Sequence, residues 1–151
     1  IPKLIERSGP GIDQQGSITA FYTVLADGDD ENDPVVDTAR AILDGHIILS
    51  RQNAQLGIYP AIDISSSVSR VMNEIIDEHH SEYARVFRKL ITLYLDNRDL
   101  ILMGGYTQGK DPDLDLAVSL WPNLIAHIRQ LEGTASNFKD SKANLLKLLK
   151  G

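Results

Sequence analysis

The chain has 151 residues, of which 42% are hydrophobic and 24% are charged, and its formal net charge is −6. A chain of this length buries roughly 70% of the surface that its unfolded form exposes, so one domain or two small ones can be stable without staples. Because the chain has no cysteine, disulfide scaffolds, thiolate zinc sites and cysteine nucleophiles are excluded. The negative charge disfavours binding of nucleic acid and anionic lipid.

Two further features concern membranes and targeting. The longest apolar stretch, about residues 18–26, is far shorter than the ~20 residues that a transmembrane helix needs. The chain begins Ile1-Pro2-Lys3, without an initiator methionine or a signal-peptide pattern. We therefore expect a piece of a longer protein.

The first half of the chain has the pattern of an α/β fold. Residues 17–25 are β-branched, aromatic and almost continuously apolar, which is typical of a strand buried on both faces of a parallel sheet. Residues 46–50 and 61–65 predict two more strands. A short helix is expected at residues 51–56, where Gly57 would end it.

A helix is predicted between the first two strands, at residues 35–44. Asp33 can cap its first amides, and Pro34 suits the first helical position. Gly45 suits a left-handed exit from the helix. The order strand, helix, strand follows.

From about residue 73 the apolar period becomes helical. Two sets of residues are spaced alternately three and four apart, which places each set in a stripe along one face of a helix. The first set is Ile76, His80, Tyr83, Phe87, Leu90 and Tyr94, and the second is Leu114, Ala117, Trp121, Leu124, Ile128 and Leu131. Asp111 and Pro112 should begin the second helix, and Pro122 should kink or split it. A third helix is expected at 136–150. We therefore divide the chain into an α/β portion, 1–72, and a small all-α domain, 73–151.

Motifs alone predict no activity. The chain contains no G-x-x-x-x-G-K-[ST] phosphate loop. The acidic run 27–33 fails the calcium-loop template, because Asn32 stands where the glycine should be and Thr38 where the glutamate should be. The four histidines lack the spacing of a helical zinc site. On spacing alone, Arg70 is an ordinary ion-pairing residue, and Tyr59-Pro60 is packing.

Several segments, however, occur in this order in one family. The sequence resembles the flagellum-specific and type III secretion export ATPases, which are relatives of the rotary ATP synthase β-subunit. The resemblance is dense over residues 1–72 and thinner through Ile101–Tyr106 and the helical tail. It rests on Glu6-Arg-Ser-Gly-Pro10, Gly16-Ser-Ile-Thr-Ala-Phe-Tyr-Thr-Val-Leu25, Gly28-Asp-Asp, Asn32-Asp-Pro34, Ile42-Leu-Asp-Gly-His-Ile-Ile-Leu-Ser-Arg51, Tyr59-Pro-Ala-Ile-Asp63 and Ser67-Val-Ser-Arg-Val-Met72.

This resemblance implies a fold and a mechanism. Residues 1–72 would be the C-terminal part of a RecA-like, P-loop nucleotide-binding domain. The whole enzyme would be a homohexamer that hydrolyses ATP with Mg²⁺ at subunit interfaces. By the resemblance, Tyr59 stacks on adenine, Pro60 fixes the turn, Arg70 reaches the neighbouring subunit's site, and Tyr106 closes the other side of the adenine. The phosphate loop and Mg²⁺ ligands would lie upstream, so we expect this chain alone to be inactive.

The resemblance also implies a location and partners: the cytoplasm, peripherally at the inner face of the membrane, with the export apparatus, a stalk and chaperone–substrate complexes. Two other hypotheses stay open: a non-catalytic helical docking module, and a fragment of a synthase β-subunit. Ala20–Val24 and Asp44–His46 favour the export branch. Gly104-Gly105-Tyr106 departs from both export types, and the flagellar type is preferred over the injectisome type.

Overall fold

The structure is a computed structural model, which describes residues 2–14, 16–25 and 33–150. It divides into two compact units, Ile1–His46 and Ile47–Gly151, which are described separately. The acidic run at 27–32 lies outside the described residues, so only Asp33 of that run has a structural account.

The first unit contains short elements. These are α1 (Pro2–Ile5), β1 (Gly9–Pro10), the 3-10 helix η1 (Ile12–Gln14), β2 (Ser17–Ile18) and α2 (Pro34–Ile42). Strands β1 and β2 pair in an antiparallel ladder, with Gly9 opposite Ile18. The Tyr22 hydroxyl donates a hydrogen bond to the Leu4 carbonyl (3.1 Å). The unit is therefore held together by a short hairpin and by local contacts.

The start of α2 was predicted correctly, and its end was not. The Asp33 carboxylate accepts hydrogen bonds from the Val35 and Val36 amides (2.7 and 3.3 Å), and Pro34 occupies the first turn. The helix ends at Ile42 because Leu43 is extended (φ −81°, ψ 149°). Gly45 is therefore not a left-handed cap, and it begins β3 (Gly45–Leu49) instead.

The long strand predicted at residues 17–25 was also wrong in length. Only Ser17–Ile18 is a strand, and the side chains of Phe21 and Leu25 are 90% and 89% exposed. A strand forms only where neighbouring backbone supplies hydrogen bonds. Within the described residues, β2 has β1 as its single neighbour, and β1 is two residues long.

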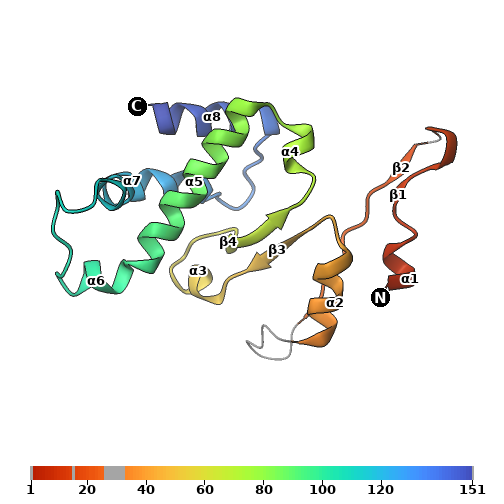
Figure 1. Ribbon diagram of the computed structural model, residues 1–151, viewed down its shortest axis with the longest axis horizontal. Helices are drawn as coiled ribbons and strands as arrows, with labels where there is room; N and C mark the ends of the chain where they lie inside the picture. Colours follow the sequence, from red (N-terminus) through yellow and green to blue (C-terminus); the bar gives the residue numbers. More distant parts are fainter. Residues whose placement is uncertain (1, 15, 26–32, 151) are drawn as a thin grey trace. The chain divides into compact units, whose positions relative to one another are not determined.

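The second sheet pairs the end of β3 with β4 (Ile62–Ser69). The Ser50 amide, just after β3, donates to the Ala61 carbonyl, just before β4 (2.7 Å), so the two strands run in opposite directions, as Figure 1 shows. Helix α3 (Arg51–Gln55) connects them, and Gly57 follows with a positive φ of 67°. The predicted short helix and its glycine stop are confirmed. The parallel neighbours that the apolar pattern predicts are not among the described strands.

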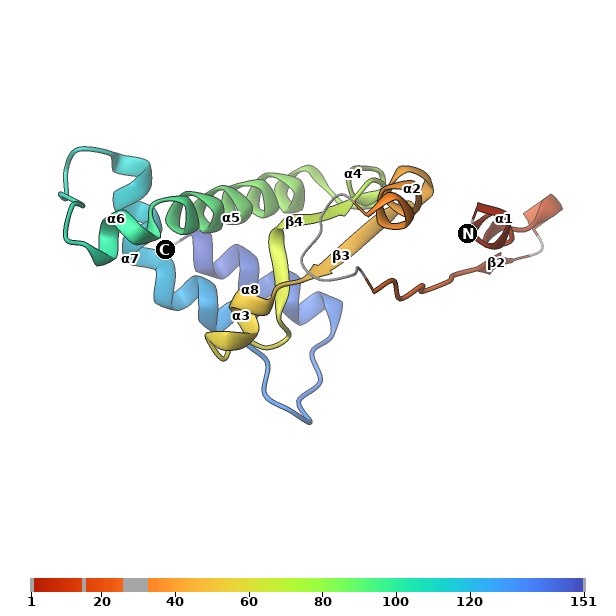
Figure 2. The same cartoon turned by 90° about the horizontal axis from the view of Figure 1, so that it is seen from below.

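The remaining elements are helices: α4 (Met72–Ile75), α5 (Glu78–Asp96), α6 (Arg98–Leu102), α7 (Pro112–Ile128) and α8 (Phe138–Lys150). Helix α5 packs against α7, α8 and β4 (Figures 1 and 2). Helix α7 begins as predicted, with Asp111 accepting from the amides of Asp113 and Leu114 (3.0 and 3.2 Å). It continues through Pro122 as one helix, so of the two predicted outcomes, a kink or a split, the split does not occur.

The core of this unit comes from the two predicted stripes. The most buried side chains are Leu90, Ala117 and Leu124, whose exposed fractions are 1%, 0% and 0%. Leu131, the last member of the second stripe, is 72% exposed because α7 ends at Ile128. The pattern therefore located the core, and it extended one turn too far.

An ion pair links α8 to the start of α5. Lys142 of α8 contacts the Asp77 carboxylate, which also accepts a hydrogen bond from the His80 amide at the start of α5 (2.8 Å). The hydrogen bonds from Lys142 and from the His80 backbone lower the pKa of Asp77 to about 2. The carboxylate therefore stays charged through ordinary acid conditions, and the pair with Lys142 persists there.

We expect stability to depend on pH through His127. Burial lowers the pKa of His127, whose ring packs edge-on against Phe87 (5.3 Å between centroids). Below the unfolded pKa of ~6.5, the unfolded chain binds a proton that the folded chain does not, so stability falls as pH drops. When the pH is lowered from 8 to 5, the free energy of unfolding measured in urea should fall less for His127→Leu than for the unmodified chain.

The matched control is His79→Gln, at an exposed position near the start of α5. It should leave the pH dependence as it is in the unmodified chain. An identical pH dependence in His127→Leu would show that burial of His127 does not contribute.

Candidate nucleotide-contact site

Tyr59 lies on the segment between α3 and β4. Its neighbour Ile58 is only 5% exposed, and the Ile58 amide donates to the Asn53 carbonyl (2.9 Å). Tyr59 itself is 55% exposed, and the Tyr59–Pro60 peptide bond is cis. The segment is thus anchored by one buried side chain, while the adjacent aromatic side chain remains accessible to a planar ligand.

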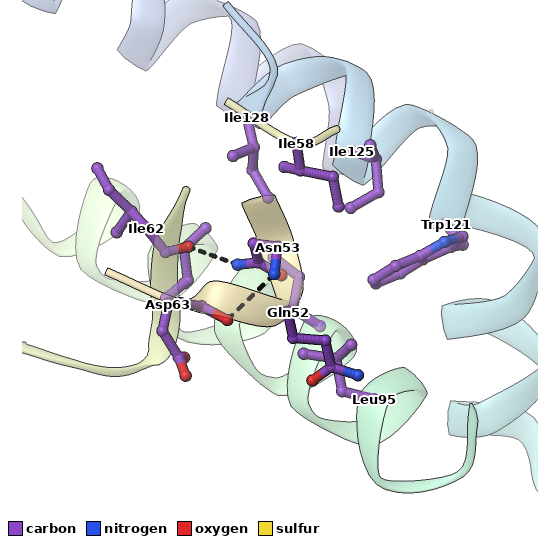
Figure 3. Close-up of a pocket in the computed structure, with 12 residues that line it drawn as sticks. Gln52, Asn53, Ile58, Ile62, Asp63, Leu95, Trp121, Ile125 and Ile128 are labelled. Carbon is purple, nitrogen blue, oxygen red and sulfur yellow. Dashed lines mark hydrogen bonds between the residues drawn. The ribbon is translucent and has the colours of Figure 1, made fainter. Parts of the chain in front are cut away.

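A small cavity lies beneath this segment. Its volume is about 40 Å³, and its apolar lining includes Ile58, Trp121, Ile125 and Ile128. Figure 3 shows Asn53 on the other side, where its side-chain amide donates to the Ile62 carbonyl (2.9 Å). A cavity of this size has room for about one water molecule and none for a nucleobase. Any stacking on Tyr59 must therefore occur on the outer surface.

A second contact reaches Tyr59 from the end of α7. The Gln130 amide donates to the Tyr59 carbonyl (2.7 Å). Sequence reasoning missed Asn53, Ile58 and Gln130. No sequence pattern distinguishes these three residues, a helical asparagine, a buried isoleucine and a loop glutamine, from ordinary structural residues.

Arg70 directly follows β4, and its side chain is exposed. Two hydrogen bonds link the strand before it to α5: the Ser65 hydroxyl bonds the Thr92 hydroxyl (2.9 Å), and the Arg88 guanidinium donates to the Ser67 backbone carbonyl (2.9 Å). The Ser67 hydroxyl also accepts from the Ile48 amide (3.0 Å). The serine run thus satisfies local groups, and it places Arg70 at the end of a well-supported strand.

Tyr106 lies in the loop between α6 and α7. Its hydroxyl donates to the Asp115 carboxylate (2.5 Å), which also accepts from the Gly109 amide (2.8 Å). The hydrogen bond to Asp115 raises the pKa of Tyr106. This loop and the α3–β4 segment, which carry Tyr106 and Tyr59, lie apart in Figures 1 and 2.

The described residues can be compared with the geometry of metal sites and of membrane-spanning helices. Within residues 2–14, 16–25 and 33–150, no three His, Asp or Glu side chains are grouped so that they could hold a metal ion. Across those same residues, no helix is long and apolar enough to cross a membrane.

Comparison with known proteins decides the family. Residues 1–69 match the model of the ATP synthase alpha/beta family, nucleotide-binding domain. Residues 76–147 match the T3SS EscN ATPase C-terminal domain. The chain belongs to the export-ATPase branch of the ATP synthase alpha/beta family. It is 52% identical, over 93% of its own length, to the flagellum-specific ATP synthase of Salmonella typhimurium.

Solved structures of export ATPases agree with this assignment. The chain is similar to the assembled ATPase EscN of the enteropathogenic E. coli type III secretion system, with a TM-score of 0.92 and 42% identity. That match covers 98% of the chain and 35% of EscN. EscN in complex with its central stalk EscO matches over 98% of the chain and 34% of EscN, with a TM-score of 0.86 and 40% identity. The chain spans 31% of the length of the Salmonella flagellum-specific ATP synthase. These matches confirm the predicted family and fold class.

Proposed function

We propose that this chain is the C-terminal part of an ATPase that energises protein export through the flagellar apparatus. The observation that carries the proposal is the accessible Tyr59 ring on a segment anchored by buried Ile58. An aromatic face offers a nucleobase ~1–3 kcal/mol of stacking without base specificity. The flagellar assignment is supported by the 52% identity to the flagellum-specific ATP synthase of Salmonella typhimurium, against 45% to the SPI-2 type 3 secretion system ATPase of the same organism.

In this proposal, ATP and Mg²⁺ bind at the interfaces of a hexameric ring. The residues present fit the nucleobase end of ATP, since Tyr59 offers a ring face and Pro60 is exposed beside it. Mg²⁺ and the phosphates would be held by the longer protein's phosphate loop. Tyr106 would contact the adenine through its ring, because its hydroxyl is engaged by Asp115.

Arg70 would act in the neighbouring subunit's site. Phosphoryl transfer spreads negative charge over the transferred group, and a guanidinium supplied in trans stabilises that charge. Two observations support this role. The Arg70 side chain is exposed, so its guanidinium can extend toward a neighbouring subunit, and the strand before it is held by hydrogen bonds, so its backbone position is fixed.

Partners and location belong to the same proposal. The relative EscN has been solved with a central stalk, EscO. Leu102 and Met103, at the end of α6, are 67% and 79% exposed, which favours a docking surface for a stalk or for chaperone–substrate complexes. This surface is also what a non-catalytic docking module would need. We place the protein in the cytoplasm, peripherally at the export apparatus, with the domain boundary near residue 72.

The test of the adenine role compares two substitutions in the whole ATPase. Tyr59→Ala should raise the KM for ATP by ~5–150-fold, the equivalent of ~1–3 kcal/mol of stacking. Tyr59→Phe keeps the ring face and should remain close to the unmodified enzyme. Steady-state ATPase kinetics measure both. Equal impairment by Phe and Ala would assign the effect to the hydroxyl, and no impairment by either would leave the docking module as the better hypothesis.

A further inference from the structure

Tyr59 is held from both sides by the end of α7. On one side, Ile58 packs into the wall formed by Ile125 and Ile128 (Figure 3). On the other, the Gln130 amide donates to the Tyr59 carbonyl. The segment that carries the exposed ring is therefore attached to a helix that lies about seventy residues later in the sequence.

The local backbone explains why Gln130 can make this bond. The last helical hydrogen bond of α7 runs from the Arg129 amide to the Ile125 carbonyl (2.8 Å). Arg129 itself is extended (φ −66°, ψ 125°), so the next amide no longer lies along the helix axis. The Gln130 amide is therefore available to the neighbouring segment. The amide group of the Gln130 side chain has a different partner and donates to the Thr134 carbonyl (2.9 Å).

The half-exposed Tyr59 ring has little packing of its own to fix its position. A ring whose supporting backbone shifts by an ångström loses its stacking geometry, and small misplacements of substrate-contacting groups are costly. Local bonds also hold this backbone, such as that from the Ile58 amide to the Asn53 carbonyl (2.9 Å), but the two anchors described above are the ones that tie it to the end of α7.

We propose that Gln130 is a positioning residue for the nucleobase: its backbone amide holds Tyr59 in place, and the end of α7 thereby sets the affinity for ATP. The proposal rests on the proposed function of Tyr59. Under this proposal the helical domain influences nucleotide affinity through a backbone hydrogen bond, which does not depend on the identity of the side chain. The role belongs to the amide and not to the glutamine side chain.

The experiment removes this one donor in the whole ATPase. Gln130→Pro has no amide proton, and the extended Arg129 is compatible with a following proline. The matched control Gln130→Ala keeps the amide and loses only the bond to Thr134. We expect Gln130→Pro to raise the KM for ATP at least ~5-fold, toward the stacking limit. The kcat should stay near the unmodified value, and Gln130→Ala should be close to unmodified in both constants.

A double substitution separates positioning from general damage. Once Tyr59→Ala has removed the ring, Gln130→Pro should raise the KM no further, because coupled residues act non-additively. A KM rise of the same size in both backgrounds would overturn the positioning role. So would an unchanged KM in Gln130→Pro when Tyr59→Ala raises it. If Tyr59→Ala leaves the KM unchanged, the adenine role itself fails, and the positioning role fails with it.

A second substitution tests the other anchor and does not depend on proline. Ile58→Val removes one methylene from the buried contact with α7, a change that core positions tolerate at modest cost. It should raise the KM for ATP in the presence of Tyr59 and have no effect in the Tyr59→Ala background. An unchanged KM in a folded Ile58→Val enzyme would contradict the role of this anchor.

Discussion

Arg70→Ala in the whole ATPase is expected to reduce kcat by ~10³–10⁵-fold while ATP binding stays nearly intact. This loss corresponds to ~4–7 kcal/mol of transition-state stabilisation. The physical reason is that a finger residue meets charge that develops only during phosphoryl transfer, so the ground state does not depend on it. Equilibrium titration with a non-hydrolysable ATP analogue and single-turnover kinetics measure the two quantities separately.

Arg70→Lys tests whether geometry or charge matters. An ammonium is a point charge, and it cannot reproduce the bidentate fork of a guanidinium. We therefore expect Arg70→Lys to recover only a small part of the lost kcat. Full recovery by lysine would show that a positive charge at the end of β4 is sufficient.

Mixed rings test the action in trans. One inactive protein carries Arg70→Ala, and the other carries a disabled phosphate loop with Arg70 intact. In rings that contain both, some interfaces combine an intact phosphate loop with an intact Arg70 from the neighbour, so activity should return. No activity at any mixing ratio, in rings shown to contain both proteins, would contradict the assignment.

The sequence predicted those parts of the fold that depend on local chemistry. The carboxylates of Asp33 and Asp111, each followed by a proline, marked two helix starts that the structure confirms. The spacing of Phe87, Leu90 and Leu124 identified the core, because helical period and burial coincide on one face. In each case, the determining contacts lie within a few residues or along one helix.

The predictions that failed depend on distant partners. An apolar run such as residues 17–25 predicts burial, but its conformation depends on which strands lie beside it. Gly45 was predicted to be the left-handed end of α2 because glycine suits that position. The prediction failed because the helix ends earlier, where Leu43 is already extended. Both errors come from treating a permissive local pattern as sufficient.

The candidate site was even less accessible to pattern analysis. Tyr59 and Arg70 were identified only through resemblance to a family, since neither residue has distinctive spacing. The bond between Gln130 and Tyr59 joins segments that the sequence gives no reason to pair. Backbone donors are common to nearly all residues, so their partners become visible only in the folded structure.

Trp121→Ala is expected to lower the free energy of unfolding of the helical domain by about 3 kcal/mol, the lower end of the range for tryptophan truncation. The lower end applies because Trp121 is only partly buried. Its ring stacks on Tyr94 with centroids 3.7 Å apart and planes 8° apart, and such a pair stabilises beyond the area it buries. Truncation would also enlarge the cavity beside Ile58. Urea unfolding followed by circular dichroism measures the loss.

Two control substitutions give this result its meaning. Leu131→Ala removes an apolar side chain that is 72% exposed, so it should change the free energy of unfolding by less than ~0.5 kcal/mol. Trp121→Phe keeps an aromatic face against Tyr94 and should recover much of the stability that alanine loses. If Trp121→Ala unfolds at the same urea concentration as Leu131→Ala, the stack with Tyr94 does not stabilise the domain. The side chain of Trp121 would then be a candidate contact for partner proteins. The attachment of the Tyr59 segment to α7 would rest on Ile58 and Gln130 without a contribution from Trp121.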